Sequence, residues 1–243
     1  MQGLSKIVFR SFSDKRKYSR MSTYIKPELP KYLTETYWWA YVHPNAVWVF
    51  ERQWLVNAIL WGNFNHLRDT ALSEFTSSGK ILQVACVYGN FTEKLAQQVD
   101  TQSEIHVVDV ADVQLENLRK KVNDFSNVKL HQQDSNAMTF EDGSFDNVIL
   151  FFLLHEQPEY ARQLSIQEAV RVCKPGGKVV FIDYHKPYAY NPFRYIMYPV
   201  LKYLEPFALD LWQKDLETWI PEVSSIQKEL YFGGLYQKVV ITK

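Results

Sequence analysis

The chain has 243 residues, of which 47% are hydrophobic and 22% charged, and it contains two cysteines. This composition is typical of a soluble globular protein and excludes collagen-like, disulfide-rich secreted and wholly disordered classes. The net charge is zero, but residues 23–243 carry 21 basic and 26 acidic residues, without the basic excess of a nucleic-acid binder.

Residues 1–22 are strongly basic, with six Lys or Arg, one Asp and several serines. This pattern lacks the continuous apolar core of a secretory signal and predicts a mitochondrial presequence. The predicted location is the mitochondrion, on the matrix face of the inner membrane. Two alternatives stay open, namely a disordered basic tail and translation that begins at Met21.

Residues 23–78 form an aromatic segment that holds five of the seven tryptophans. Apolar residues from Val47 to Trp61 predict a helix with a wide apolar face that begins after His43-Pro44. The longest uncharged stretches, 37–50 and 53–67, are shorter than the ~20 residues of a membrane-spanning helix.

From Lys80 onward, strand-like and helix-like segments alternate, which predicts a parallel sheet with right-handed crossovers. The prolines of segment 186–219 and its many aromatic residues predict an inserted helical lid. Two final strands flank Gly233-Gly234 and predict an antiparallel hairpin. The expected strands are 81–86, 104–110, 128–131, 145–154, 178–184, 226–232 and 235–242, and the expected helices are 90–99, with Asn90 as its cap, 112–125 and 158–173.

A turn containing Gly89 follows the first strand, and Asp109 closes the second strand 20 residues later. This spacing is typical of a nucleoside site in which the acid accepts hydrogen bonds from the ribose hydroxyls. The turn has one glycine where three are usual, and Val87 obstructs a pyrophosphate. The pattern therefore disfavours nicotinamide and flavin dinucleotides and leaves a phosphate-free ligand such as S-adenosylmethionine (SAM). The two cysteines, Cys86 and Cys173, are predicted to be buried free thiols.

Residues 80–184 resemble the class I SAM-dependent methyltransferases, especially the ubiquinone and menaquinone C-methyltransferases. The resemblance implies an α/β fold, with a Rossmann-like, seven-stranded, mostly parallel sheet and an antiparallel C-terminal hairpin over residues 79–243. An N-terminal helical segment and a helical insertion would complete it. The matching stretches are Ile81–Gly89, Val107–Asp109, Gln133–Ser135, Phe140–Asp146, Arg171–Gly177 and Phe181–Tyr184.

Much of the chain after residue 22 is also similar to rhodoquinone-biosynthesis proteins of RquA type. That resemblance implies conversion of ubiquinone to rhodoquinone by exchange of a ring methoxy group for an amino group. SAM would be the amino donor and Mn²⁺ a helper ion. The stretches that carry it are Thr36–Val42, Phe50–Phe64, Gln83–Thr92, Phe151–Pro158, Asp183–Pro187 and Leu204–Trp212.

The resemblances assign most of the candidate site. Gln83 stands where relatives have an acid near the ligand's ammonium, so we hypothesise that it favours the neutral, nucleophilic amine. The cofactor contacts implied are Gln83, Ala85, Cys86, Val87, Tyr88, Gly89, Asp109, Val110, Asp134, Ser135 and Phe151.

Tyr88 and His155 are the predicted catalytic residues. Tyr88 would orient the amine or a quinone oxygen, or else pack beneath the adenine. His155 would act as general base, or else as a cap or as a hydrogen-bond partner that supports a neighbouring site residue. The metal ligands stay unidentified, with His155, Glu156, Asp183 and His185 as candidates at the sheet edge.

Three functions remain open from the sequence. The first is rhodoquinone formation, the second is methyl transfer to a quinone or phenol, and the third is an inactive methyltransferase-like subunit of a quinone-synthesis complex. The aromatic segments 37–64 and 188–212 either cover the core or form a quinone cleft with a docking face for peripheral membrane contact.

Overall fold

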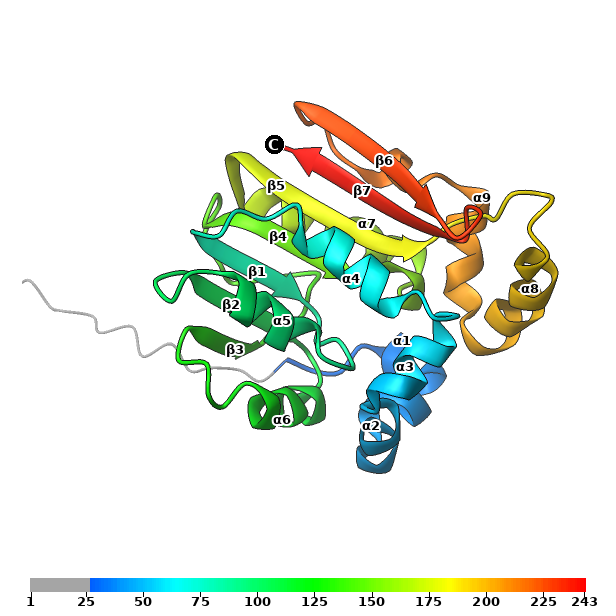
Figure 1. Ribbon diagram of the computed structural model, residues 1–243, viewed down its shortest axis with the longest axis horizontal. Coiled ribbons are helices and arrows are strands. Elements are labelled where there is room, and N and C mark those ends of the chain that lie inside the picture. Colours follow the sequence, from blue (N-terminus) through cyan, green and yellow to red (C-terminus); the bar gives the residue numbers. More distant parts are fainter. Residues whose placement is uncertain (1–26) are drawn as a thin grey trace, which may run out of the picture.

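The computed structural model describes residues 27–243, and the predicted presequence lies outside this range (Figure 1). A seven-stranded sheet forms the centre of the molecule, in the order β3-β2-β1-β4-β5-β7-β6. The first five strands are parallel, and β7 pairs antiparallel with both β5 and β6. The predicted fold class is confirmed. The strands are β1 (Lys80–Val84), β2 (Glu104–Asp109), β3 (Val128–Gln132), β4 (Phe145–Phe151), β5 (Cys173–Tyr184), β6 (Ser225–Tyr231) and β7 (Tyr236–Thr242).

Helices cover both faces of the sheet. In Figure 1, α4 (Phe64–Leu72) and α5 (Phe91–Gln98) lie in front of the strands and α7 (Glu159–Val172) lies behind them. The side chains of Val148–Phe151 in β4 are at most 2% exposed. A strand segment that is buried on both faces is apolar throughout, which explains why Val148–Phe151 shows no polar alternation. Helix α6 (Asp112–Lys121) connects β2 to β3 and ends four residues before the predicted boundary.

The aromatic N-terminal segment differs from its prediction. It begins with α1 (Lys31–Thr36) and a π-helical turn at Trp38–Val42, and the predicted single helix is two helices, α2 (Pro44–Phe50) and α3 (Gln53–Ile59). They are separated at Arg52, whose backbone is extended and whose guanidinium lies 4.2 Å above the ring centre of Trp48. The sequence contains no Gly or Pro at this break that would predict the end of a helix, and the hydrophobic periodicity continues through it.

The strand predicted to reach Leu154 ends at Phe151, because Phe152 has a left-handed backbone with φ +53°. The chain then forms a short 3-10 turn, η2 (Leu154–Glu156). Strand β5 begins at Cys173, five residues before the predicted start. Asn90 is the N-cap residue of α5, but its side chain makes no capping bond and accepts from Arg68 Nη1 at 2.6 Å.

Residues 186–219 contain α8 (Phe193–Leu204), η3 (Pro206–Leu209), α9 (Asp210–Gln213) and η4 (Leu216–Trp219). Helix α8 lies at the side of the sheet near α1 and α3 (Figure 1). Within residues 27–243, no helix is both long enough and apolar enough to cross a membrane.

Candidate active site

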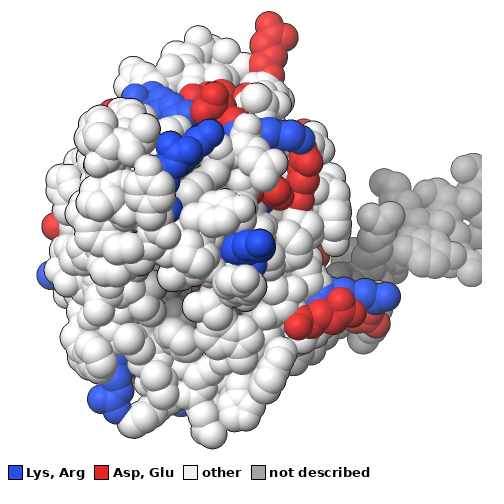
Figure 2. Space-filling view, turned by 90° about the vertical axis from the view of Figure 1, so that its right-hand side faces the viewer, with Lys and Arg blue, Asp and Glu red and all other residues white. Residues whose placement is uncertain are grey.

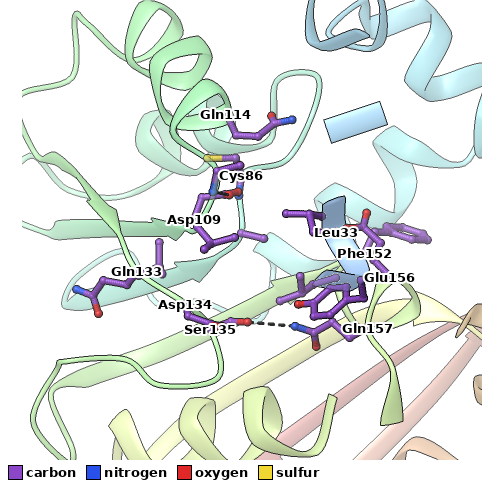
Figure 3. A pocket seen from close by; sticks show the side chains of 16 residues that line it. Leu33, Cys86, Asp109, Gln114, Gln133, Asp134, Ser135, Phe152, Glu156 and Gln157 are labelled. Carbon is purple, nitrogen blue, oxygen red and sulfur yellow. Dashed lines mark hydrogen bonds between the residues drawn. The ribbon is translucent and has the colours of Figure 1, made fainter. Parts of the chain in front are cut away.

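The candidate site lies at the carboxyl ends of the parallel strands, where the strand order reverses between β1 and β4. Open α/β sheets bind ligands at this reversal because the loops diverge there and leave a crevice. A narrow cavity of about 60 Å³, here called the edge cleft, opens at this position (Figure 3). Its lining includes Ala85, Cys86, Asp109, Val110, Asp134 and Ser135, all predicted from the sequence, together with Tyr32, Leu33, Gln114, Gln133, Phe152, Glu156 and Gln157.

Asp109 joins two loops of the edge cleft. One carboxylate oxygen accepts from the Cys86 backbone N–H and the other from that of Ala111, both at 2.8 Å. Burial raises the pKa of Asp109 to about 6, and the backbone N–H donors oppose this shift. Since each carboxylate oxygen has two acceptor sites, Asp109 retains the capacity to accept hydroxyl donors.

Asp134 and Ser135 lie opposite, after β3. Asp134 accepts from the backbone N–H of Asn136 at 2.9 Å. The Ser135 hydroxyl lies 2.8 Å from that of Ser165 and accepts from Gln157 Nε2 at 3.1 Å (Figure 3). These bonds fix the loop to η2 and α7 and place Asp134 across the cleft from Asp109.

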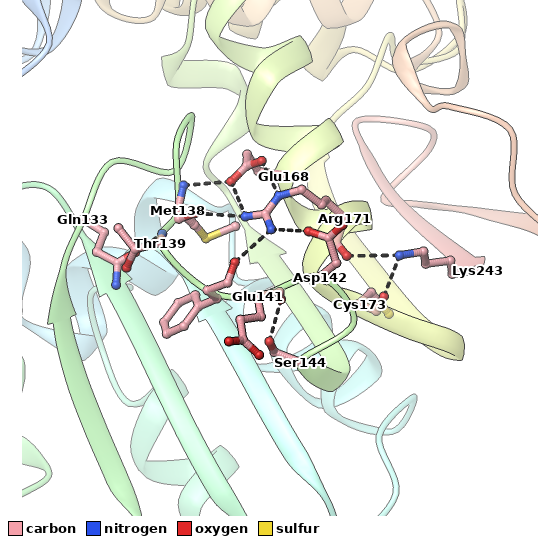
Figure 4. A network of polar contacts seen from close by, with 11 residues as sticks. Gln133, Met138, Thr139, Glu141, Asp142, Ser144, Glu168, Arg171, Cys173 and Lys243 are labelled. Atoms are coloured by element: carbon pink, nitrogen blue, oxygen red, sulfur yellow. Dashed lines mark hydrogen bonds and ion pairs between the residues drawn. The ribbon is translucent and has the colours of Figure 1, made fainter. Parts of the chain in front are cut away.

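A second polar network holds this loop from behind (Figure 4). Arg171 of α7 pairs with Glu168 at 2.7 Å and with Asp142 at 2.6 Å, and its guanidinium donates to the backbone oxygens of Met138 and Phe140. Nearby, a Cβ on Gly177 would lie 2.7 Å from the Asp146 oxygen, which only glycine avoids. Arg171 and Gly177, at the two ends of a stretch that carried part of the resemblance, are therefore both required by the local structure.

Gln83 lines neither cavity of the site. Its side chain is 0% exposed, its amide nitrogen donates to the Ala85 oxygen at 3.0 Å, and its amide oxygen accepts from Thr92 at 2.9 Å. The predicted direct contact with a ligand ammonium therefore finds no support in this geometry. Gln83 instead stabilises the turn at Ala85, whose φ of +75° is rare for a residue with a Cβ.

Gly89 also has a left-handed backbone, with φ +77°, and its loop is held by a residue that sequence reasoning missed. The Gln53 side-chain oxygen accepts from the Asn90 N–H at 3.0 Å and would lie 2.7 Å from a Cβ on Gly89. Gln53 therefore binds an otherwise unpaired donor at the start of α5. No sequence signal pointed to it, because it comes from a distant helix.

A larger cavity of about 460 Å³, here called the apolar cavity, adjoins the edge cleft. Its walls come from α2, α3, α4, the loop after β1, the end of β4 and α8. Apolar and aromatic side chains dominate its lining, and His155, Glu156 and Glu205 are its few ionisable groups. The lining includes the predicted residues Val87, Tyr88 and Phe151, with Trp39, Phe50, Val56, Ile59, Trp61, Phe64, Tyr184, Met197, Val200, Leu201 and Leu204 among the others.

The two cavities meet at three residues, because Cys86, Phe152 and Glu156 line both. Cys86 is therefore partly exposed, contrary to the prediction of a buried thiol, while Cys173 is buried as predicted. Burial and the neighbouring Asp109 raise the pKa of the Cys86 thiol well above its usual value, so it remains protonated. A molecule in one cavity would face a molecule in the other across this junction.

Tyr88 contributes its ring to the wall of the apolar cavity and stacks on Phe50 at a centroid distance of 6.0 Å. Its hydroxyl donates to the Ala40 oxygen at 2.7 Å and accepts from Gln114 Nε2 at 2.7 Å. Because both bonds are internal, the geometry favours packing over the predicted orienting role of this hydroxyl. The predicted packing partner, however, was an adenine.

His155 is 5% exposed and forms a buried pair with Asp183, Nδ1 to Oδ1 at 3.0 Å. Its Nε2 lies 3.8 Å from a carboxylate oxygen of Glu156. Burial lowers the pKa of His155, but the Asp183 carboxylate outweighs this effect and raises the pKa to about 9. A protonated imidazole donates protons, so the environment does not fit the predicted general base and fits a general acid.

His155, Glu156 and Asp183 lie close together, but the four candidate metal ligands are not arranged around one ion. His185 Nδ1 lies 2.9 Å from the Gly234 oxygen, and Asp183 accepts from the backbone N–H groups of Leu154, His155 and Tyr184. In the described part of the chain, no group of three or more His, Cys, Asp or Glu side chains is arranged to hold a metal ion. The described residues therefore do not fit a Mn²⁺ site built from protein ligands.

Arg162 of α7 supports the turn that carries His155 and Glu156. It is 0% exposed, and its guanidinium donates to the backbone oxygens of Leu154, Gln157 and Phe207 at 2.8–2.9 Å. These bonds satisfy carbonyl groups on both η2 and η3. The residue thereby fixes the turn against the segment that follows α8.

Comparisons with known proteins agree with this geometry. Residues 81–177 match the family described as methyltransferase domain. A demethylmenaquinone methyltransferase of Staphylococcus aureus (strain MRSA252) is 36% identical over 108 residues, 44% of each chain. One of Anoxybacillus flavithermus (strain DSM 21510 / WK1) is 32% identical over 147 residues, 59% of this chain and 61% of the relative. The chain thus spans about half the length of these curated relatives.

Among solved structures, a SAM-dependent methyltransferase from Aquifex aeolicus superposes with a TM-score of 0.54 at 18% identity, over 82% of this chain and 97% of that one. At this identity, the likeness concerns the fold. Residues 81–177 therefore resemble a methyltransferase domain, and the sheet order and the superposition show that the chain has the fold of the class I SAM-dependent methyltransferases.

Proposed function

We propose that this protein is a SAM-dependent enzyme that acts on a lipid quinone and exchanges a ring methoxy group of ubiquinone for an amino group. The observation that carries the proposal is the junction of the two cavities at Cys86, Phe152 and Glu156. A cleft with carboxylate and amide groups in its wall, compatible with a ribose, meets a large aromatic cavity there, as a reaction between a nucleoside donor and a flat apolar acceptor requires.

The edge cleft suits the adenosyl part of SAM. Asp109 would accept from the ribose hydroxyls, and Asp134 would accept from the adenine amino group. Bound SAM would supply either an electrophilic methyl group or a nucleophilic amine. The obstructed glycine loop, with Val87 in the wall of the apolar cavity, favours a ligand without phosphates.

The apolar cavity suits the quinone ring and the start of its isoprenoid tail. Its volume of about 460 Å³ and its aromatic walls match a flat ligand without charge. The curated relatives are named for activity on demethylmenaquinone, which supports a quinone acceptor. The resemblance to rhodoquinone-biosynthesis proteins supports amino transfer as the reaction.

The proposed reaction balances without an added oxidant. Ubiquinone, SAM with a neutral amine, and water give the aminoquinol, methanol and the 2-oxo acid of the donor. A carbon–nitrogen bond forms as the bond to methoxy breaks. The two electrons of the donor's Cα–H bond reduce the ring, and water releases the nitrogen from the donor skeleton. The quinone itself is therefore the electron acceptor.

Two neighbouring side chains would handle the protons. Glu156 lies at the junction and would accept the proton that the attacking amine loses. His155, held protonated by Asp183, would donate to the quinone oxygen as charge develops on it. Their side chains lie 3.8 Å apart, so the proton would return from carboxylate to imidazole through one water molecule or after a small side-chain rotation.

The test is a reaction of purified protein with SAM labelled with ¹⁵N at its amine and a ubiquinone analogue, with mass spectrometry of the quinone. Labelled nitrogen in place of methoxy supports the proposal. Added methyl mass would instead establish quinone methyl transfer, which the names of the relatives favour. SAM binding by calorimetry without any product would indicate an inactive subunit.

A matched pair of variants tests the proton roles. Glu156→Gln keeps the shape of the side chain but removes the base, and it is expected to lower amino transfer by at least about a hundredfold. Glu116→Gln on α6, the control, lines neither cavity and is expected to change the rate by less than about twofold. Equal effects of the two substitutions would refute the role of Glu156.

A further inference from the structure

The mouth of the apolar cavity continues onto an exposed apolar surface. Four large apolar residues line the cavity and are also open to solvent: Ile59 at the end of α3 and Trp61 two residues beyond it are 44% and 39% exposed, and Val200 and Leu204 of α8 are 37% and 50% exposed. Soluble proteins seldom leave a contiguous apolar rim of this kind uncovered. A ligand that enters this cavity would come from the space beyond that rim.

Helix α8 is apolar on two sides. Met197 and Leu201 pack into the core, whereas Ile196, Val200 and Tyr203 follow each other at helical spacing on the outer side, with exposures of 47%, 37% and 77%. A helix that is apolar on more than one side is typical of a protein core or of a membrane surface. Within the described residues, only the side with Met197 and Leu201 is packed into the core.

Exposed tryptophans extend this apolar surface onto the N-terminal segment. Trp48 and Trp54 of α2 and α3 are 66% and 67% exposed, and Trp61 Nε1 contacts Met197 Sδ at 3.2 Å, which joins this segment to α8. Tryptophan and tyrosine concentrate where proteins meet the boundary between lipid tails and water.

The segments that form this surface carry basic but no acidic side chains, and Glu51 and Glu205 flank them in sequence. Residues 186–204 include Lys186, Arg194 and Lys202 and no Asp or Glu, and residues 52–68 also lack acids. Figure 2 views this side of the molecule and shows a broad area almost free of charged side chains. Basic groups around an apolar area complement the negative surface of a membrane that contains anionic lipids.

We infer that this surface, defined by Trp54, Ile59, Trp61, Ile196, Val200 and Tyr203, docks on a phospholipid membrane with the cavity mouth toward the bilayer. The apolar side chains enter the interface, and the lysines and arginines bind lipid phosphates. Passage of a quinone from the bilayer into the cavity rests on the proposed function, whereas the docking itself does not.

Sedimentation with phosphatidylcholine vesicles, with and without phosphatidylserine, tests the inference. The full chain is expected to bind both, and more tightly with phosphatidylserine at low salt. Ile196→Glu and Tyr203→Glu are each expected to weaken binding by at least about tenfold. The matched control is Ile226→Glu on β6, because Ile226 is 43% exposed on a strand away from this surface. It is expected to bind as the unaltered chain does.

Three outcomes would overturn the inference: equal binding by all variants, equal loss in the Ile226→Glu control, or a lipid-free dimer that Ile196→Glu dissociates. The last outcome would assign the surface to a second copy of the chain. Thermal unfolding of each variant verifies that it is folded.

A short-tailed, water-soluble quinone separates docking from the proposed function. Ile196→Glu is expected to retain turnover of this quinone and to lose turnover of a long-tailed quinone in vesicles. Vesicle binding by a chain that turns over neither quinone would refute the proposed function and leave the docking inference intact.

Discussion

Replacement of His155 by glutamine removes the ionisable member of the pair with Asp183 and thereby changes how stability depends on pH. The pKa of His155 rises from 6.5 to about 9 on folding. A group whose pKa is raised in the folded state stabilises that state fully below the unfolded pKa, and this stabilisation is lost as pH rises through the folded pKa. The difference between 6.5 and about 9 corresponds to about 3 kcal/mol. It is present below pH 6.5 and lost by about pH 9.

Urea unfolding across this pH range measures the effect. The quantity to compare is the free energy of unfolding of the unaltered chain minus that of His155→Gln. This difference is expected to be about 3 kcal/mol larger below pH 6.5 than above pH 9. His185→Gln is the control, because burial lowers the pKa of that residue and its removal leaves the slope between these pH values in place. Parallel pH profiles for the unaltered chain and His155→Gln would refute the assignment of a protonated, Asp183-paired imidazole.

Other predictions concern the cleft, its loop and the core. Asp109→Asn is expected to weaken SAM binding by at least about tenfold in calorimetry, and SAM affinity of the unaltered chain is expected to fall as pH falls below about 6, where Asp109 becomes protonated. Gly89→Ala introduces a Cβ at φ +77° beside Gln53 and is expected to cost about 1–2 kcal/mol in chemical unfolding; an unchanged midpoint would contradict the strain. Phe181→Ala deletes a ring that is 0% exposed and is expected to cost about 3–5 kcal/mol, with a loss below 1 kcal/mol indicating that the core is not packed as described.

The sheet was predictable because its strands are short apolar runs between helix-length segments. Both faces of β4 are buried, so the whole run from Val148 to Phe151 is apolar, and the signal is unambiguous. The prediction of strand ends failed where local backbone geometry, and not the hydrophobic pattern, ends the strand. Phe152 is as apolar as its neighbours, yet its left-handed backbone ends the strand. A phenylalanine side chain does not predict this backbone conformation.

The candidate site was predictable at strand ends and not elsewhere. Asp109 and Asp134 follow directly from strands whose carboxyl ends share one edge, and both line the edge cleft. Gln83 lies beside them in sequence, but its side chain points into the core and lines neither cavity. Tyr32 and Gln53 come from helices far along the chain, and only three-dimensional packing places them at the cleft or its loop.

Arg162 gives the site a further property. One guanidinium fastens the backbone on both sides of His155 and Glu156 and, at the same time, the first turn beyond α8, at the Phe207 carbonyl. The turn that carries His155 and Glu156 and the segment that follows α8 are consequently held by one side chain, and neither depends on the sheet alone for its position.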